Sequence, residues 1–444
     1  MSMPTIQVPF TNEVIQRNRV TQVKQTKRGI RIYLEPNRQE RYQRPDCAEP
    51  VKVQQHIVEE VTVQELGLPG QQVRYRVKVV RVLYVNNAGE EKTFTLDVPG
   101  VRIKLKMTEA VVEKALYFMI DRNQSLSETK QLLWDIYGVK TSVPALHRLK
   151  MAEADKLPHQ GEIIRALNAH RKITALHIDE YKAKGTRGWE LVIRDEHSRL
   201  LVSLYLRTRS EKKLKVVLRW LRMLGIQAEV CYVDGWAPYL TAIPAIYPQA
   251  VIQYDYFHII QNIWRHLYRA FTAYRKAFKK AKTEKQQQAL RDKMHKKLWK
   301  HRYLLFTHEA NLSDEDKAVL EELLAEHKGT ILEQIVAFTQ RIWNLFNNSP
   351  TKLTANLKRF SLIAEGWGSL SKHFAKVIDF LNRYFTQMIA YIDDERVQRH
   401  SLAETTVRMV RRIERVRQGF KSAWGRAAHF KLWQYRRYLC PQLA

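Results

Sequence analysis

The sequence predicts a multidomain α/β protein, and three observations support this. The chain has 444 residues, of which 45% are hydrophobic, so it can bury more than one core and should form about two to four domains. Strand and helix patterns alternate between residues 171 and 257, as they do around an α/β sheet. Residues 258–397 are helical in pattern throughout and have no fixed repeat, which indicates an all-helical insertion.

The net charge points to a polyanionic partner. The chain carries a formal charge of +30 and has a pI near 10.0. A fold does not need such an excess, whereas binding to nucleic acid does, so double-stranded DNA is the expected partner. A membrane surface is the weaker alternative, because there is no apolar run of about 18 residues, no lipidation signal and no signal peptide in residues 1–10.

The three cysteines give no sign of a disulfide framework or a zinc cluster. Cys47, Cys231 and Cys440 lie far apart in the chain. Because stapled or zinc-binding domains place cysteines in close, paired spacings, we expect a protein of a reducing prokaryotic cytoplasm, near the nucleoid.

The N-terminal third is expected to contain a basic arm and a small β domain. Residues 1–45 are polar and basic with little periodicity, so we expect an extended or partner-ordered segment. Residues 46–107 contain alternating runs such as Val73–Val79 and turn residues at 86–89, which predict hairpins. Arg and Lys occupy the outward positions, and a solvated face and a DNA-facing one are equally compatible with that pattern.

Residues 108–155 are patterned as a helix-turn-helix DNA-binding domain. A first helix is followed by a second that opens with a capping box at Ser125 and ends at Gly138, and a third begins at Ser142. A plain helical domain is the alternative, since short three-helix units are common. The candidate base-facing residues of the third helix are Ser142, His147, Arg148 and Lys150.

The order of elements in residues 171–257 specifies a topology. Three strands in succession are followed by helix, strand, short helix and strand. This order is the ribonuclease-H-like topology, in which the first and fourth strands are neighbours. The expected strands are 173–179, 189–194, 199–206, 228–233 and 250–254, and the expected helices are 210–224 and 237–246.

Two aspartates stand where the first and fourth strands are expected to end. Asp179 follows the apolar run 173–178, and Asp234 follows the run 231–233. Taken singly, each is more often a helix cap or turn residue than a catalytic group. On neighbouring strands, however, the two carboxylates repel one another unless cations bridge them. The pair therefore predicts a divalent-metal site of the kind that two-metal phosphoryl transfer needs.

A third acid is expected from a helix laid against the sheet. Glu404 stands at the front of a predicted helix with Ser401 as a plausible cap. An exposed Glu404–Arg408 pair at i,i+4 is the alternative interpretation, and this segment alone does not decide between them. Helical periodicity places Glu404, Arg408, Arg411 and Arg415 in one sector. The rival third ligands are Glu180, Glu190 and Asp255, of which Asp255 is the strongest because it too ends a strand.

The motifs around these acids resemble those of a known family. The matching segments are His177–Lys182, Tyr232–Tyr239, Tyr247–His258, Ser401–Glu404, Arg411–Arg412 and Arg417–Phe420. Together they resemble the DDE transposases of bacterial insertion sequences, in the IS-L-three group, and the resemblance spans roughly residues 45 to 440.

The resemblance implies a fold, a site and a chemistry. The ribonuclease-H-like catalytic core would comprise residues 171–257 and 398–440, with 258–397 as the helical insertion. Asp179, Asp234 and Glu404 would be the catalytic residues and would bind two Mg²⁺ (or Mn²⁺) ions per active site. The sequence departs from the family in two places: the zinc-finger-like region keeps only Cys47, and the usual asparagine near the glutamate is absent.

The mechanism expected from this resemblance is hydrolysis and transesterification of DNA with no covalent protein intermediate. The terminal inverted repeats of the element and its target DNA would be the partners, held by a homodimer or higher oligomer because two ends are cut together. Trp236 is a candidate for stacking on an unpaired base, although a core role is commoner for tryptophan. The residues expected to grip phosphates are Arg408, Arg411, Arg412 and Arg415.

Two other functions fit the same sequence features. One is a DNA-binding regulator that keeps a transposase fold without catalysis, and the other is a structure-specific nuclease of the same superfamily. The helical insertion likewise has two possible roles, as a structural element or as a basic clamp on a DNA backbone.

Overall fold

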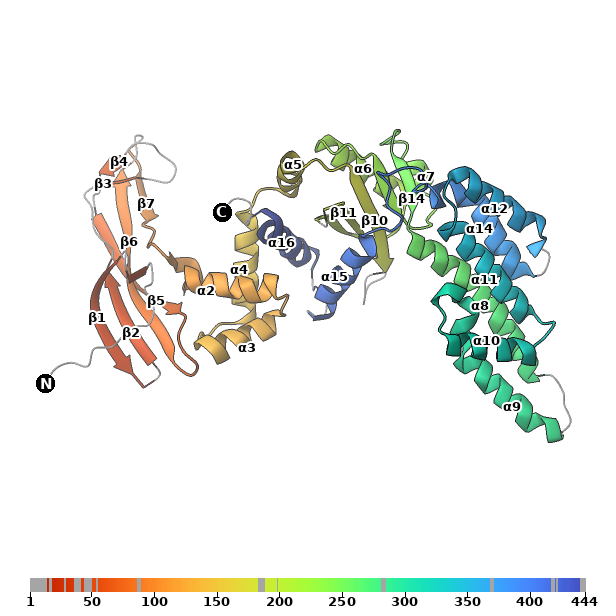
Figure 1. Cartoon of the computed structure of the whole chain (residues 1–444). Coiled ribbons are helices and arrows are strands. Elements are labelled where there is room, and N and C mark those ends of the chain that lie inside the picture. The colour runs from red at the N-terminus through yellow and green to blue at the C-terminus, as the bar shows by residue number, and fades with distance from the viewer. Residues whose placement is uncertain are drawn as a thin grey trace. The chain divides into compact units, whose positions relative to one another are not determined.

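The computed structural model is mixed α/β and divides into two compact units (Figure 1). One unit comprises residues 1–163 with 409–444, and the other comprises residues 164–408. The structure describes residues 14–15, 18–27, 29–35, 41–43, 50–52, 55–85, 89–182, 188–197, 199–280, 285–367, 371–416, 420 and 422–439. Among the helices in these ranges, none combines the length and the apolar composition that a bilayer crossing requires.

The first unit is built on a seven-stranded sheet with the order β1-β2-β6-β5-β9-β8, in which β7 also pairs with β6. The strands are β1 (Arg19–Thr26), β2 (Gly29–Glu35), β5 (Gln55–Glu65), β6 (Gln72–Val85), β7 (Glu91–Thr95), β8 (Val101–Arg102) and β9 (Met107–Thr108). β3 (Arg41–Gln43) and β4 (Pro50–Lys52) form a separate pair. Alternate residues of β2 and β6, such as Leu34 and Val77, form the core of this sheet.

Part of the predicted basic arm is a β-hairpin. β1 and β2 pair antiparallel from Arg19↔Glu35 to Thr26↔Gly29, and β2 continues into the sheet by parallel pairing with β6. The apolar alternation of Ile32 and Leu34 explains this, because it buries one face of β2. Gly29 has a φ of +140°, and a Cβ there would lie 1.9 Å from the carbonyl oxygen of Gln72, so only glycine fits this position.

The helices of the first unit begin and end at the predicted signals. α2 (Glu109–Leu116) precedes α3 (Leu126–Tyr137), whose capping box at Ser125 is present and whose end is Gly138 at a φ of +62°. α4 (Val143–Asp155) is capped by Ser142. The capping predictions are therefore confirmed.

The C-terminal helix α16 (Ala423–Gln434) belongs to the first unit, although the sequence analysis placed it in the core of the second. It packs against α4. Lys150 donates to the carbonyl of Gly425 over 2.8 Å, and Lys431 donates to the carbonyls of Ala154 and Leu157 over 2.8 and 2.9 Å. These contacts join segments about 275 residues apart, which local sequence patterns do not reveal.

The second unit contains a five-stranded sheet in the order β12-β11-β10-β13-β14. β10 and β12 run antiparallel to β11, which lies between them, whereas β13 and β14 run parallel to β10. The predicted adjacency of the first and fourth strands is confirmed by the β10–β13 pairing. The elements are α5 (Gln160–His170), β10 (Ala175–Lys182), β11 (Trp189–Asp195), β12 (Leu200–Leu206), α6 (Glu211–Met223), β13 (Val230–Val233), α7 (Tyr239–Ala242) and β14 (Val251–Tyr254).

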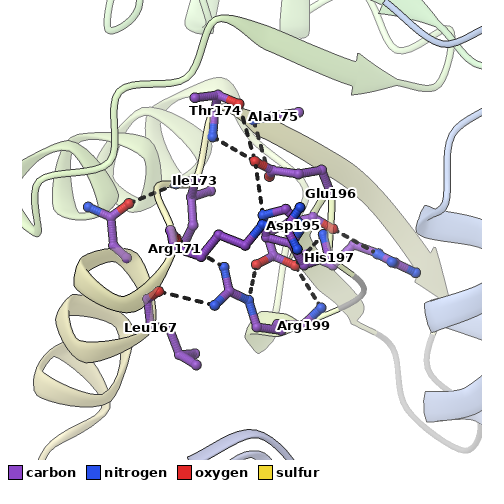
Figure 2. A network of polar contacts seen from close by, with 11 residues as sticks. Leu167, Arg171, Ile173, Thr174, Ala175, Asp195, Glu196, His197 and Arg199 are labelled. Carbon is purple, nitrogen blue, oxygen red and sulfur yellow. Dashed lines mark hydrogen bonds and ion pairs between the residues drawn. The ribbon is translucent and has the colours of Figure 1, made fainter. Parts of the chain in front are cut away.

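A polar network fixes the edge of this sheet where β10 begins (Figure 2). The buried carboxylate of Asp195 accepts hydrogen bonds from the backbone N–H and the guanidinium of Arg199. Arg199 also donates to the carbonyls of Leu167 and Arg171, at the C-terminal end of α5. Because the last carbonyls of a helix lack partners within the helix, this arginine satisfies them and ties α5 to the sheet.

The helical insertion follows β14 and returns to the sheet at its end. Its helices are α8 (Tyr256–Lys280), α9 (Lys285–Lys300), α10 (Asp314–Glu326), α11 (Ile331–Asn347), α12 (Lys352–Ala364) and α14 (Lys372–Met388). The predicted helical character of this segment is confirmed. Gln253 of β14, which is fully buried, accepts a hydrogen bond from the Tyr391 backbone over 2.9 Å and donates to the Met388 carbonyl, so the end of α14 is fastened to the sheet.

Candidate active site

Three parallel strands bring acidic residues to one edge of the five-stranded sheet. Asp179 lies in β10, Asp234 directly follows β13, and Asp255 directly follows β14. Since the carboxyl ends of parallel strands meet at the same edge, residues distant in the chain become neighbours there. This is the edge at which sites form in sheets of this kind.

The position of Asp179 within its strand differs from the prediction. The sequence analysis ended the strand at 179, whereas β10 runs on to Lys182. The reason is its pairing with β11, which continues through Asp179↔Val192 to Lys182↔Trp189, whereas its pairing with β13 stops at His177. Asp179 therefore lies beyond the last residue pair between β10 and β13, in a part of β10 that still pairs with β11.

Asp179 meets Glu404 and His258. One ligand atom from each of the three side chains lies within 4.8 Å of the other two. Asp179 is buried, whereas His258 and Glu404 are half-buried. The three come from β10, the start of α8 and the first turn of α15 (Ala403–Val416). Two carboxylates and an imidazole this close form a donor set that a divalent cation fits.

The environment of Asp179 disfavours the ionised form of its carboxyl group. Burial raises its pKa, and so do the carboxylates of Asp234, Glu180 and Glu404, to about 8. Like charges at short range disfavour ionisation of each other, and low solvent access strengthens the effect. A bound cation reverses this balance, because it favours the ionised form.

Asp234 is directed partly toward an arginine. Its carboxylate accepts hydrogen bonds from the Arg209 guanidinium at 3.1 and 3.4 Å and from the Trp236 backbone at 2.9 Å. It lies outside the group formed by Asp179, His258 and Glu404, but it is near enough to contribute to the raised pKa of Asp179. The structure thus brings Asp179 and Glu404 into one group and places Asp234 beside it.

Arg209 joins two acids and two aromatic rings. The same guanidinium nitrogen that reaches Asp234 donates to Glu180 over 2.7 Å. The guanidinium lies 4.1 Å from the ring centre of Trp236 and 5.1 Å from that of Trp189. Trp236 is therefore covered on one face by a cation, a cation–π contact that stabilises the pair.

The three rival ligands have other partners. Glu180 accepts hydrogen bonds from Arg209 and from the Tyr239 hydroxyl, and burial raises its pKa. Glu190 is fully buried and accepts a hydrogen bond from Ser203 of β12. Asp255 accepts from the Phe257 backbone, at the start of α8. Asp255 therefore caps the start of α8, a common role for aspartate.

Two sheet residues hold the start of α15 near Asp179. The Leu402 backbone donates to Nδ1 of His177, and Arg194 donates to the Leu402 carbonyl over 3.0 Å and to the Thr406 hydroxyl over 2.9 Å. His177 stacks on Tyr232, with ring centres 4.2 Å apart. Burial lowers the pKa of His177 to about 3, so the ring is neutral and can accept the bond.

A cleft of about 250 Å³ opens beside the acids. Its lining includes Asp234, Asp255 and His258, together with Arg209 and Arg265. Acidic and basic side chains thus share one concave surface, and a few converging polar groups of this kind are typical of ligand sites.

Other predicted site residues lie on exposed helical surfaces, with one exception. Ser142, His147 and Arg148 are exposed on α4, whereas Lys150 is only 2% exposed and bonds to Gly425. The assignment of Lys150 to a DNA-facing surface was therefore wrong, because its position on α4 faces α16. On α15, the exposed arginines are Arg408, Arg411, Arg412 and Arg415.

Basic residues on the sheet of the first unit have acidic partners. Arg76 pairs with Glu60 at 3.0 Å and Lys78 with Glu35 at 3.3 Å. Because charges paired across strands are typical of a solvated sheet face, this arrangement favours the solvated interpretation. Cys47, Cys440 and residues 417–419 lie outside the described residues, while Cys231 is a buried thiol.

Sequence reasoning missed His258 as a site residue. It was noted only as part of the motif that ends with it, and no ligand role was assigned to it. Its spacing from Asp255 was the available signal: the acid caps α8, which places the histidine one turn in, on the side toward Asp179.

Comparison with known families finds a matching family model. A family model described as a transposase, of the DDE type and the IS-L-three group, matches residues 176–424, which is more than half of the chain. The matched range contains Asp179, Asp234, His258 and Glu404. No curated protein matches the chain.

Proposed function

Because the chain belongs to the IS-L-three family of DDE transposases, we propose that it binds the terminal inverted repeats of an insertion sequence and performs Mg²⁺-dependent DNA cleavage and strand transfer. The observation that carries this proposal is the meeting of Asp179 and Glu404 with His258, beside Asp234, at the carboxyl edge of one sheet.

The sheet supports a ribonuclease-H-like catalytic core. Its order of strands, with three antiparallel strands followed by two parallel ones, is the order that this topology requires. That topology pairs the first and fourth strands, so the acids of β10 and β13 reach one site without help from long loops. The helical insertion before α15 agrees with the same architecture.

Asp179, Asp234 and Glu404 are the proposed metal ligands, and His258 is a fourth donor. Carboxylate oxygens are the ligands that Mg²⁺ prefers, and an imidazole adds affinity for Mn²⁺. Two bound ions would activate a water or a DNA 3′-hydroxyl and stabilise the leaving oxygen. The pKa of Asp179, raised by burial and by its acidic neighbours, supports a site that accepts added positive charge.

Arg209 has a proposed role of its own in this site. It holds Asp234 in position through hydrogen bonds and brings a positive charge to the cleft wall. A guanidinium fixed between Trp189 and Trp236 is preorganised to contact a phosphate oxygen of bound DNA.

DNA recognition is assigned to two helical surfaces. Helices α2, α3 and α4 would form the helix-turn-helix, with Ser142, His147 and Arg148 exposed on the third helix. The exposed arginines of α15 would contact phosphates. Cutting both ends of an element in one complex would require at least two copies of the chain.

The test is cleavage of a labelled duplex that bears the terminal repeats. Wild-type protein with Mg²⁺ should cut it, and Asp179→Ala and Glu404→Ala should abolish cutting while binding stays nearly intact. Asp314→Ala is the matched control, because this aspartate is fully exposed at the start of α10. Binding without any metal-dependent cutting by the wild type would contradict the proposal and leave a regulator. Preferential cutting of branched DNA would instead indicate a structure-specific nuclease.

A further inference from the structure

One face of α8 carries both aromatic rings and arginines into a second cleft. Trp264, Arg265, Tyr268 and Arg269 recur at spacings of three and four residues, so they lie on one side of the helix. The 3-10 helix Arg302–Phe306 closes the other side of the cleft. The volume of about 540 Å³ lies within the range typical of ligand sites.

The aromatic rings of this cleft are unusually open. Trp264 is 38% exposed, Tyr268 is 37% exposed and Tyr303 is 55% exposed, whereas Phe306 forms a buried floor. Tyr268 and Phe306 contact each other with ring centres 6.1 Å apart. Large apolar groups gathered in one concave exposed patch indicate a binding surface, because a folded chain otherwise buries them.

The charge of the cleft is positive. α8 contains no Asp or Glu, and Arg265 and Arg269 are exposed and form no ion pair with any residue that the structure describes. Arg302 lies 4.1 Å from the ring centre of Trp299. A cleft with apolar walls and uncompensated guanidinium groups at its rim suits a flat aromatic ligand that carries negative charge.

The cleft adjoins the cleft of the candidate active site. Gln261 and Arg265 line both this cleft and the one that contains Asp234 and His258. From His258 to Tyr268 the helix rises about 15 Å, at about 1.5 Å per residue. At about 3.4 Å per stacked nucleotide, that distance corresponds to about four nucleotides of one DNA strand.

We propose that this cleft binds unpaired nucleobases of the DNA strand that extends from the active site. The bases would stack on Tyr303, Trp264 and Tyr268, and Arg265 and Arg269 would contact the phosphates. Stacking on aromatic rings beside arginines is how proteins hold single strands without reading their sequence. This inference rests on the proposed function only in taking DNA as the substrate.

The experiment measures binding of DNA in the absence of metal, so that it does not depend on cleavage. A terminal-repeat duplex with a single-stranded overhang of about five nucleotides carries 2-aminopurine at one overhang position at a time. We expect wild-type protein to alter the probe's fluorescence most strongly at about the fourth position and to bind this DNA more tightly than the blunt duplex.

The double variant Tyr268→Ala/Tyr303→Ala should weaken binding of the overhang DNA about tenfold or more and leave binding of the blunt duplex unchanged. Tyr303→Phe keeps the ring and should bind as the wild type does. Phe360→Ala is the matched control, because this ring is 56% exposed on α12, outside the cleft.

Three results would overturn the inference. They are equal binding of overhang DNA by the double variant and the wild type, loss of blunt-duplex binding to the same degree, and a Tyr303→Phe variant as weak as the alanine variant. If the double variant instead abolishes self-association and leaves DNA binding intact, the cleft is an interface between copies of the chain. If the wild type fails to cleave DNA, the proposed function is contradicted. The binding measurements still test this inference, because they are made without metal and do not depend on cleavage.

Discussion

The backbone N–H of Leu402 donates a hydrogen bond of 3.1 Å to Nδ1 of His177. Leu402 stands two residues before Glu404, and His177 stands two residues before Asp179 on β10. This bond therefore connects the segment that carries Glu404 to the strand that carries Asp179, although the two acids are separated by more than two hundred residues. It fixes the first turn of α15 on the sheet.

Replacing His177 with phenylalanine should loosen this connection. The ring can still stack on Tyr232, but the Leu402 N–H loses its acceptor, so we expect a loss of about 1–3 kcal/mol in the free energy of unfolding. Cleavage should also require more Mg²⁺ for half-maximal rate, because Glu404 is held less firmly. Urea unfolding and a Mg²⁺ titration measure the two effects. His177→Asn restores an acceptor and should recover part of both, and identical behaviour of the two variants would contradict the explanation.

Removing Arg209 should destabilise the fold through Glu180. The Glu180 side chain is 1% exposed, and Arg209→Gln leaves it buried without its cation, which typically costs about 3–5 kcal/mol. The double variant Arg209→Gln/Glu180→Gln removes the buried charge as well and should recover most of the loss. Urea unfolding of the two single variants and the double variant measures the coupling. If the effects of the single changes simply add, the pair does not contribute to stability in this way.

Asp179 should make the metal-free protein less stable as pH rises. Its pKa is about 8 in the folded chain and near 3.8 without the fold, so between these values the folded state binds a proton that the unfolded state has lost. Stability is then greatest below the lower value and falls until the pH passes the upper one. Thermal unfolding between pH 5 and 8 tests this. Asp179→Asn should reduce the slope, and Mg²⁺ should stabilise the wild type more at pH 8 than at pH 5.

Lys150 and Arg148 should differ in their effect on DNA binding, although they are two residues apart. Arg148 is exposed, and if it contacts a phosphate, Arg148→Ala should lower the slope of log affinity against log salt by about 0.9. Lys150→Met should leave that slope unchanged and lower the free energy of unfolding, because Lys150 donates to the Gly425 carbonyl. Binding isotherms at several salt concentrations separate the two. A changed slope for Lys150→Met would indicate that this lysine contacts DNA after all.

His258 should influence which metal supports cleavage. Imidazole nitrogen suits Mn²⁺ better than Mg²⁺, so His258→Gln should reduce the Mn²⁺-supported rate more than the Mg²⁺-supported rate. Cleavage rates with each ion alone measure the ratio. His266→Gln is the control, because this histidine lies on the same helix but outside the group around Asp179. An equal loss with both ions would indicate that His258 acts on the DNA and not on the metal.

Local signals in the sequence gave most of the elements and their order. The places of the five strands of the second sheet follow from short apolar runs, although β10 extends past its predicted end. The caps at Ser125 and Ser142 follow from side chains that accept hydrogen bonds from the helix start, and the end at Gly138 follows from the left-handed backbone that glycine adopts. Periodicity also predicted that α15 would expose its arginines. These features depend on neighbours within a few residues, so they can be predicted from the sequence alone.

Features that depend on distant partners were not predictable in the same way. The burial of Lys150 depends on α16, and the pairing of Asp234 with Arg209 depends on how the turn before α6 meets β13. The hairpin in the basic N-terminal segment depends on β6, which supplies the pairing edge for β2. None of these partners is close in sequence.

The sequence by itself determined that Asp179 and Asp234 would lie at one edge of the sheet, because the order of strands and the apolar runs before the two acids fix that edge. Only the tertiary structure decided which side chains lie beside each acid. His258 and Glu404 lie close to Asp179, while Arg209 donates a hydrogen bond to Asp234. The physical reason is that periodicity is a property of neighbouring residues, whereas the distance between two side chains is set by packing between elements far apart in the chain.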